Sequence, residues 1–107
     1  MSSSDHRRVI VRYMVKPERV AENEELVRAV YDELHRIQPA GLRYATFRQN
    51  DGVSFVHFAS TETEDGRNPL SDLQAFKQFQ ENIDDRCDEA PVVTELREIG
   101  SFRLFGD

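Results

Sequence analysis

The sequence predicts an α+β domain with the ferredoxin-like order β-α-β-β-α-β, in which two helices cover one face of a four-stranded antiparallel sheet. Three observations predict this order. Segments rich in β-branched and aromatic residues occur near both ends and in the middle of the chain. Segments with apolar residues at helical spacing separate them, and an Asp-Gly pair joins the two middle strands. The length of 107 residues suits one domain.

The first strand is expected over Arg8 to Lys16 (RVIVRYMVK), which is apolar on both faces apart from Arg12. Such a segment is typical of a strand in the centre of a sheet. A helix follows from Pro17, because proline suits the first helical turn and apolar residues then recur at helical spacing. This helix is expected to end near residues 39–41 (PAG).

The two middle strands, 42–49 and 53–60, are separated by Asn50-Asp51-Gly52, a strong hairpin signal. A two-residue turn pairs Thr46 with His57 and Arg48 with Phe55, whereas a three-residue loop would exchange these partners. The apolar face is then expected to pack under the helices; it comprises Ala45, Phe47, Val56 and Phe58. The opposite face is expected to stay open; it comprises Leu42, Tyr44, Thr46, Arg48, Phe55 and His57.

The second helix is expected over Ser71 to Arg86, because its first four residues (SDLQ) have the pattern of a capping box and an apolar stripe follows. The last strand is expected over Val92 to Phe105, with a bend or bulge at Gly100. These two elements complete the predicted order.

Composition limits the possible partners and the location of the protein. The net charge of −6 argues against nucleic acid or an anionic membrane as a partner, since both require clustered positive charge. No apolar stretch approaches the roughly 20 residues that span a bilayer, and the start of the chain lacks a secretory signal. We therefore expect a cytoplasmic protein with a flexible N-terminal tail over 1–7 and a single domain over 8–107.

The open face of the sheet predicts self-association. Two helices cover only one face of four strands, so the face with Leu42, Tyr44 and Phe55, joined by Ile10 and Met14 of the first strand, needs another cover. Leaving about five large apolar side chains in water would forgo on the order of 10 kcal/mol, which is comparable to the stability of a domain. We expect a homodimer that pairs through this face.

Four segments carry a resemblance to a known family. They are Lys16-Pro17-Glu18 after the first strand, residues 41–44 (GLRY), residues 55–58 (FVHF) and the long closing strand. Together they resemble the antibiotic biosynthesis monooxygenase superfamily of dimeric α/β barrels. The resemblance covers about residues 8 to 105 and implies that two sheets face each other to form a barrel. It also implies that Ser101 to Phe105 forms an arm reaching into the partner's half.

The resemblance implies a cofactor-independent monooxygenase that acts on a small phenolic or quinol molecule. Haem-degrading members of the superfamily use a tryptophan and a histidine on the second helix. This chain has no tryptophan, and no histidine lies between Ser71 and Arg86. Haem degradation is therefore not expected, and no cofactor is predicted.

His57 is the candidate catalytic residue, because it titrates near neutrality and is expected on the same face as other polar side chains. An arginine there would hold an anionic or phenolic oxygen, and aromatic rings would enclose the ligand. The ligand-pocket candidates are Arg12, Tyr44, Thr46, Arg48 and Phe55. A hydrogen-bonded dimer interface would use the same residues, so a non-catalytic module that binds a small molecule or a protein remains the alternative.

The remaining chemistry-bearing residues predict no further site. His35 is expected at the edge of the first helix's apolar stripe and His6 in the tail, and no histidine pairs at metal-ligand spacing with another ligand. Metal binding is therefore not predicted. Cys87 is expected to pack at the end of the second helix, where the acidic run around it would raise its pKa.

Overall fold

The computed structural model describes residues 6–105, and these residues form an α+β domain with the predicted element order. The four strands are β1 (Arg7–Val15), β2 (Leu42–Arg48), β3 (Ser54–Thr61) and β4 (Cys87–Leu96). They form one antiparallel sheet with the order β2-β3-β1-β4, so β1 and β3 are central. Residues 1–5 of the expected tail lie outside the described residues, and Arg7 already belongs to β1.

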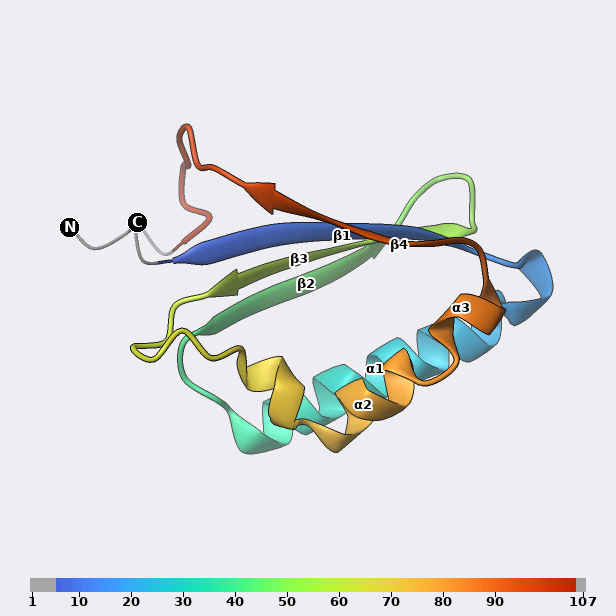
Figure 1. Ribbon diagram of the computed structural model, residues 1–107, viewed down its shortest axis with the longest axis horizontal. Coiled ribbons are helices and arrows are strands. Elements are labelled where there is room, and N and C mark those ends of the chain that lie inside the picture. The colour runs from blue at the N-terminus through green and yellow to red at the C-terminus, as the bar shows by residue number, and fades with distance from the viewer. Residues whose placement is uncertain (1–5, 106–107) are drawn as a thin grey trace.

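The helices lie together on one side of the sheet, and the other side has no helix over it (Figure 1). The first helical segment consists of a short 3-10 turn, η2 (Pro17–Arg19), and α1 (Val20–Ile37). α1 ends at Gln38, which has a left-handed backbone (φ 55°) and is followed by Pro39. The start and end of this segment were predicted correctly.

The predicted hairpin register is confirmed. Thr46 lies opposite His57 and Arg48 opposite Phe55 in the β2–β3 pair. The loop between the strands is longer than two residues. The hydrogen bond from the amide of Gln49 to the carbonyl group of Ser54 closes the hairpin, and this leaves residues 50–53 in the loop. A four-residue loop keeps the register of a two-residue turn, since it adds one residue to each side. Gly52 supplies the left-handed conformation in this loop, with φ 81°.

The predicted assignment of the two sheet faces is wrong. Phe55 and His57 lie under the helices and are 2% and 5% exposed, whereas Phe47, expected in the core, is 60% exposed on the uncovered face. Ile10 and Met14 do lie on the uncovered face, but their partners in register are Phe58 and Ser54. The face with His57 is therefore the core face of the protomer.

The polar groups of α1 explain why this face is covered. The hydroxyl group of Tyr31 lies 2.8 Å from that of Thr46, so side chains that look unsuited to a core are hydrogen-bonded beneath the helix. The other face is the more hydrocarbon-rich one, and it was assigned to the core for that reason. The buried apolar residues between sheet and helices include Tyr13, Val15, Val27, Val30, Phe55, Leu70, Leu73 and Phe79.

The predicted second helix, 71–86, is three short segments rather than one. They are η3 (Pro69–Asp72), α2 (Gln74–Gln80) and α3 (Ile83–Arg86). Leu73 has an extended backbone, and Asn82 is left-handed with φ 57°, so the helix is interrupted at both places. The predicted capping box does not form, because no side chain of the cap residue bonds the start of α2. Instead, the carboxylate of Glu33 on α1 accepts hydrogen bonds from the amides of Gln74 and Ala75.

The last strand was predicted too late in the chain. β4 begins at Cys87, directly after α3, and it ends at Leu96, opposite Arg8. Arg8 is close to the start of β1 at Arg7, and the chain leaves the sheet after Leu96, before it reaches Gly100. Cys87 is thus a buried strand residue rather than the end of a helix. Within residues 6–105 no helix is both long and apolar enough to cross a membrane.

Candidate functional site

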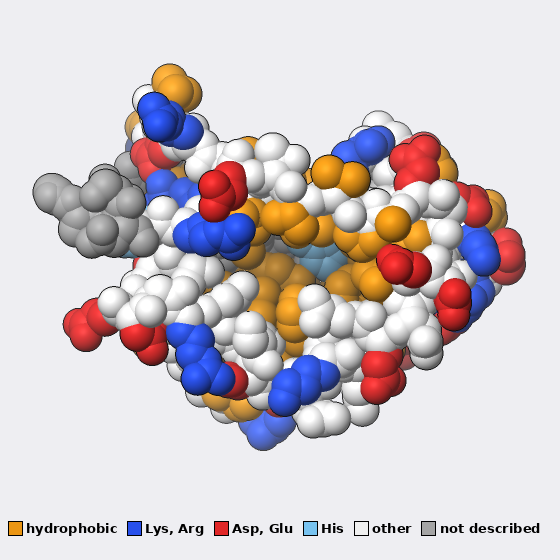
Figure 2. Space-filling view, in the orientation of Figure 1, with side chains coloured by type: hydrophobic (Ala, Val, Ile, Leu, Met, Phe, Trp, Pro, Cys, Tyr) orange, Lys and Arg blue, Asp and Glu red, His pale blue; other side chains and the backbone are white. Residues whose placement is uncertain are grey.

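A cavity of about 310 Å³ lies between the sheet and the segments η3, α2 and α3. Figure 2 shows a hollow at this level of the molecule, lined mainly by hydrophobic side chains, with a histidine visible at its base. Its walls are apolar and come from both layers, including Val9, Val11, Val93, Phe76 and Phe79. Cavities of this size and character are typical of small-molecule sites.

The polar base of the cavity is formed by Tyr13, Tyr44 and His57, and we call these three residues together with the adjoining Thr46 the histidine cluster. The central strand β3 holds His57 between its neighbours β1 and β2. Its Nε2 atom is 2.8 Å from the hydroxyl oxygen of Tyr13. Its Nδ1 atom is 2.7 Å from the hydroxyl oxygen of Tyr44 and 3.1 Å from that of Thr46. Both ring nitrogens therefore have partners within the protein.

Burial determines the protonation of the histidine cluster. Desolvation lowers the pKa of His57 to about 4, so its imidazole ring is neutral at pH 7. Desolvation likewise raises the pKa of the Tyr13 and Tyr44 hydroxyl groups well above the usual value, so both stay protonated. The cluster is a neutral set of hydroxyl and imidazole groups that exchange hydrogen bonds.

Two further buried residues extend the cluster away from the cavity. The side-chain amide nitrogen of Asn23 is 3.0 Å from the hydroxyl oxygen of Tyr13, and Nε of Arg86 is 3.2 Å from Oδ1 of Asn23. Arg86 is 1% exposed, and its other guanidinium nitrogens donate to the carbonyl groups of Phe79 and Glu81. A buried cation thus lies at the inner end of the hydrogen-bonded chain.

Sequence reasoning missed Tyr13, Asn23 and Arg86. A signal was present for two of them. Asn23 occupies a position of the apolar stripe of α1, three residues after Val20 and four before Val27. A polar residue in such a stripe needs a buried partner. Tyr13 lies two residues from Val11 and two from Val15, so it shares the core-facing side of β1 with these valines. Nothing in the local sequence distinguishes Arg86 from a surface arginine.

Two predicted ligand-pocket residues do not reach the cavity. Arg12 lies on the uncovered face of the sheet, where its Nε donates to the side chain of Gln49 at 2.8 Å. It belongs to the other side of β1 because side chains alternate along a strand. Arg48 shares the covered face with His57 but forms an ion pair with Glu24 of α1 at 3.0 Å.

Phe55 and Thr46 lie near the cavity without lining it. The ring of Phe55 stacks on that of Tyr13 with centroids 5.5 Å apart and fills the core. Thr46 contacts Nδ1 of His57, as described above, and faces α1. Of the predicted site residues, His57 and Tyr44 line the cavity together.

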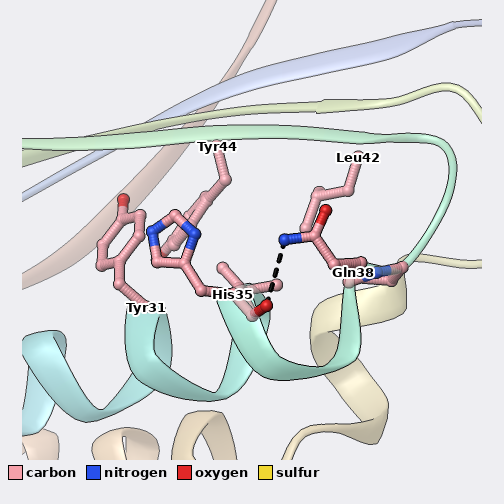
Figure 3. A pocket seen from close by; sticks show the side chains of 7 residues that line it. Tyr31, His35, Gln38, Leu42 and Tyr44 are labelled. Carbon is pink, nitrogen blue, oxygen red and sulfur yellow. Dashed lines mark hydrogen bonds between the residues drawn. The ribbon is translucent and has the colours of Figure 1, made fainter.

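A second hollow, of about 320 Å³, lies on the other side of Tyr44, between α1 and the edge strand β2. Figure 3 shows Tyr31 and His35 extending from α1 toward β2. The rings of Tyr31 and Tyr44 stack with centroids 5.3 Å apart, and Tyr44 lines both hollows. His35 is exposed, as expected, and lies outside the histidine cluster.

The described residues offer no metal centre. No three His, Cys, Asp or Glu side chains within residues 6–105 come together as a possible metal site. Burial is the main cause that raises the pKa of the Cys87 thiol, and Asp84 and Asp88 of the acidic run raise it further, as expected. This thiol is therefore poorly suited to act as a nucleophile.

The structure of this chain is similar to solved structures of other proteins. Neither a family model nor a curated protein matches the sequence. A solved structure from Nitrosomonas europaea, provisionally named an antibiotic biosynthesis monooxygenase, superposes with a TM-score of 0.72 at 16% identity, covering 89% of this chain and 91% of that one. The chain has the antibiotic biosynthesis monooxygenase fold.

Two further structures with this fold extend the comparison. A protein from Bacteroides thetaiotaomicron, with the same provisional name, has a TM-score of 0.75 at 13% identity and covers 90% of this chain and 91% of its own. A point mutant of SnoaB from Streptomyces nogalater, described as a cofactor-independent oxygenase, has a TM-score of 0.66 at 16% identity over 91% and 96% of the two chains. At these identities the fold is shared.

Proposed function

We propose that the protein is a cofactor-independent monooxygenase that acts on a small phenolic or quinol molecule in the 310 Å³ cavity. The observation that carries this proposal is the combination of apolar walls with the histidine cluster at the base. A flat aromatic molecule suits such walls, and its oxygen atom suits the hydroxyl groups. The fold shared with a cofactor-independent oxygenase supports the same chemistry.

In the proposed reaction the substrate itself supplies the electrons. The phenolate of a quinol is electron-rich and reduces dioxygen, so that one ring C–H group becomes C–OH and the quinol becomes a hydroxyquinone. One oxygen atom of dioxygen becomes the oxygen of the new hydroxyl group. The other leaves as water with the two hydrogen atoms of the quinol hydroxyl groups, so four electrons pass from substrate to dioxygen. No external reductant is required.

The protein's part is to bind and orient the substrate, to exclude water and to exchange hydrogen bonds with the phenolic oxygen. Because both ring nitrogens of His57 contact hydroxyl groups, His57 acts on the substrate through Tyr44 rather than directly. Arg12 has no role in this cavity, since it lies on the opposite face of the sheet.

The second candidate function is a non-catalytic module that binds a small molecule. The observation in its favour is that His57 is fully engaged by protein groups, as expected for a structural hydrogen-bonded core. Both candidates use the same cavity. They differ in whether dioxygen is consumed.

Oxygen uptake with a panel of phenols and quinols distinguishes the two. The oxygenase predicts turnover of at least one substrate, reduced about tenfold or more in Tyr44→Phe and His57→Gln, because each variant removes a group that contacts or orients the phenolic oxygen. The matched control is Tyr31→Phe, which loses one hydroxyl group outside the cavity and is expected to keep the wild-type rate. Binding without oxygen uptake would support the non-catalytic module.

We also propose that the protein is a homodimer formed through the uncovered face of the sheet. Phe47, Val92 and Leu96 are 60%, 63% and 40% exposed on this face, next to the half-buried Phe58. A second copy presents the same apolar surface and would bury it on both sides. Phe105 packs on Phe58 of its own chain, with ring centroids 6.2 Å apart.

The segment after β4 suits the rim of this dimer. Phe102 and Leu104 are 79% and 66% exposed, so they have apolar surface that a partner would cover. The arm predicted over 101–105 is part of the same proposal.

A further inference from the structure

Hydrogen bonds connect the buried side chains of Arg86, Asn23, Tyr13 and His57, and the donor and the acceptor of each bond can be assigned in turn. A guanidinium group donates hydrogen bonds and accepts none, so Oδ1 of Asn23 must be the atom that accepts from Arg86. This contact settles the orientation of the Asn23 amide. Its nitrogen then donates to the hydroxyl oxygen of Tyr13 at 3.0 Å. Asn23 is 0% exposed, so a reversed amide would leave two buried donors facing each other.

The same reasoning passes through Tyr13 to His57. The oxygen of Tyr13 accepts from Asn23, and its single hydrogen atom is available for Nε2 of His57 at 2.8 Å. Nε2 is then the unprotonated nitrogen of the ring. Burial keeps the imidazole neutral, so its one hydrogen atom must lie on Nδ1.

The direction continues into the cavity. The Nδ1 hydrogen of His57 faces the hydroxyl oxygens of Tyr44 and Thr46, and both oxygens act as acceptors. Their own hydrogen atoms therefore point away from the ring. Thr46 is adjacent to the hydroxyl groups of both Tyr31 and Tyr44, and of these three residues Tyr44 is the one that lines the cavity. Tyr13 also lines it, but its hydrogen atom is already donated to His57.

We propose that Arg86 and Asn23 are positioning residues, which hold His57 in its Nδ1–H form and thereby make Tyr44 the hydrogen-bond donor to a ligand oxygen. The cavity consequently selects aromatic ligands whose polar atom is an acceptor, above all a phenolate oxygen. The identity of the ligand class rests on the proposed function. The direction of the chain does not, because it follows from contacts within the protein.

The test is the ¹⁵N NMR spectrum of the His57 ring in the ligand-free protein at pH 7, since protonated and unprotonated ring nitrogens have well-separated chemical shifts. The proposal predicts that Nδ1 is the protonated nitrogen, with a preference of about tenfold or more over the other neutral form, because the alternative leaves a buried hydrogen bond unmade. A ring protonated on Nε2, on both nitrogens, or equally on either would overturn it.

The variant Asn23→Asp tests the positioning role. A carboxylate accepts from both Arg86 and Tyr13, so the Tyr13 hydrogen atom turns toward residue 23 and its oxygen accepts from His57. The proposal predicts that the ring proton moves to Nε2. Retention on Nδ1 would contradict it. The control Tyr31→Phe removes a hydroxyl group beyond Thr46 and is expected to leave the proton on Nδ1.

A second variant covers the case in which Asn23→Asp does not fold. Tyr13→Phe removes the donor to Nε2, and the preference for Nδ1–H is expected to disappear; an unchanged preference would contradict the proposal. If the ring is in the Nδ1–H form but no phenol binds, the proposed function fails while the positioning role stands. If phenols bind but the His57 ring is in the Nε2–H form, the positioning role fails while the proposed function stands.

Discussion

His57 has a pKa that differs between the folded and unfolded chain, and this difference makes stability depend on pH. The unfolded chain takes up a proton at His57 as the pH falls below about 6.5. The folded protein resists protonation until the pH reaches about 4, because burial disfavours the charged ring. The unfolded state thus binds more protons between these values, and the free energy of unfolding must fall as the pH is lowered through this window.

We expect His57 to contribute a loss of about 3 kcal/mol between pH 6.5 and pH 4, and this contribution to level off below pH 4, where the ring is protonated in both states. Urea unfolding at a series of pH values measures it. His57→Gln is the control, since it keeps a buried polar side chain but does not titrate. A variant with the same dependence on pH as the wild type would show that His57 is not the group responsible.

Glu33 on α1 caps the start of α2, in place of the local capping box that the sequence predicted. Its carboxylate accepts from two amides at the start of α2, which has only seven residues and no cap side chain of its own. Glu33→Ala is expected to lower the free energy of unfolding by about 1 kcal/mol, because orphan amides and the helix dipole lose their partner.

Chemical denaturation measures this cost against Asp32→Ala, which removes an exposed carboxylate one residue away. The control is expected to change stability by less than about 0.5 kcal/mol. Equal effects in the two variants would mean that the contact between Glu33 and α2 does not stabilise the fold.

The sequence predicts some features of the fold better than others. Features that depend on neighbouring residues are predicted well, and features that depend on contacts between separate elements are not. The β2–β3 register depends on the local signal of Asp51-Gly52 and was predicted correctly. The choice of covered face depends on contacts between residues far apart in sequence, such as Tyr31 with Thr46 and Asn23 with Tyr13. A rule that buries the more apolar face cannot anticipate such polar pairs.

The candidate site was predicted in part for the same reason. His57, Tyr44 and Thr46 share one face because strand pairing alone brings them together. Arg12 was placed with them by an assumption about β1 that its register contradicts. Arg86 joins the site only through the break at Asn82 and the turn into α3, which no local pattern indicates.

The molecule as a whole has two different surfaces on its two sheet faces, which separates the proposed ligand site from the proposed dimer interface. The cavity and the histidine cluster lie under the helices, whereas the exposed Phe47 and Val92 lie on the other side. The sequence had suggested that one face serves both purposes. The structure instead allows each surface to be altered independently.

Phe47→Asp is expected to convert the proposed dimer into a monomer at micromolar concentration, because it puts a charge into the proposed apolar interface of both copies. Light scattering measures the mass in solution. The control Gln78→Asp adds the same charge on an exposed position of α2, away from this face, and is expected to remain a dimer. A wild-type protein that is monomeric at micromolar concentration would contradict the proposed interface.

The cavity under the helices is proposed to bind a small phenol, and a titration with 2-naphthol followed by NMR of the valine methyl groups tests this. We expect shifts at Val9, Val11 and Val93, which line the cavity, and none at Val56 and Val92 on the other face. Shifts confined to Val56 and Val92, or no shift at any of the five valines, would contradict it.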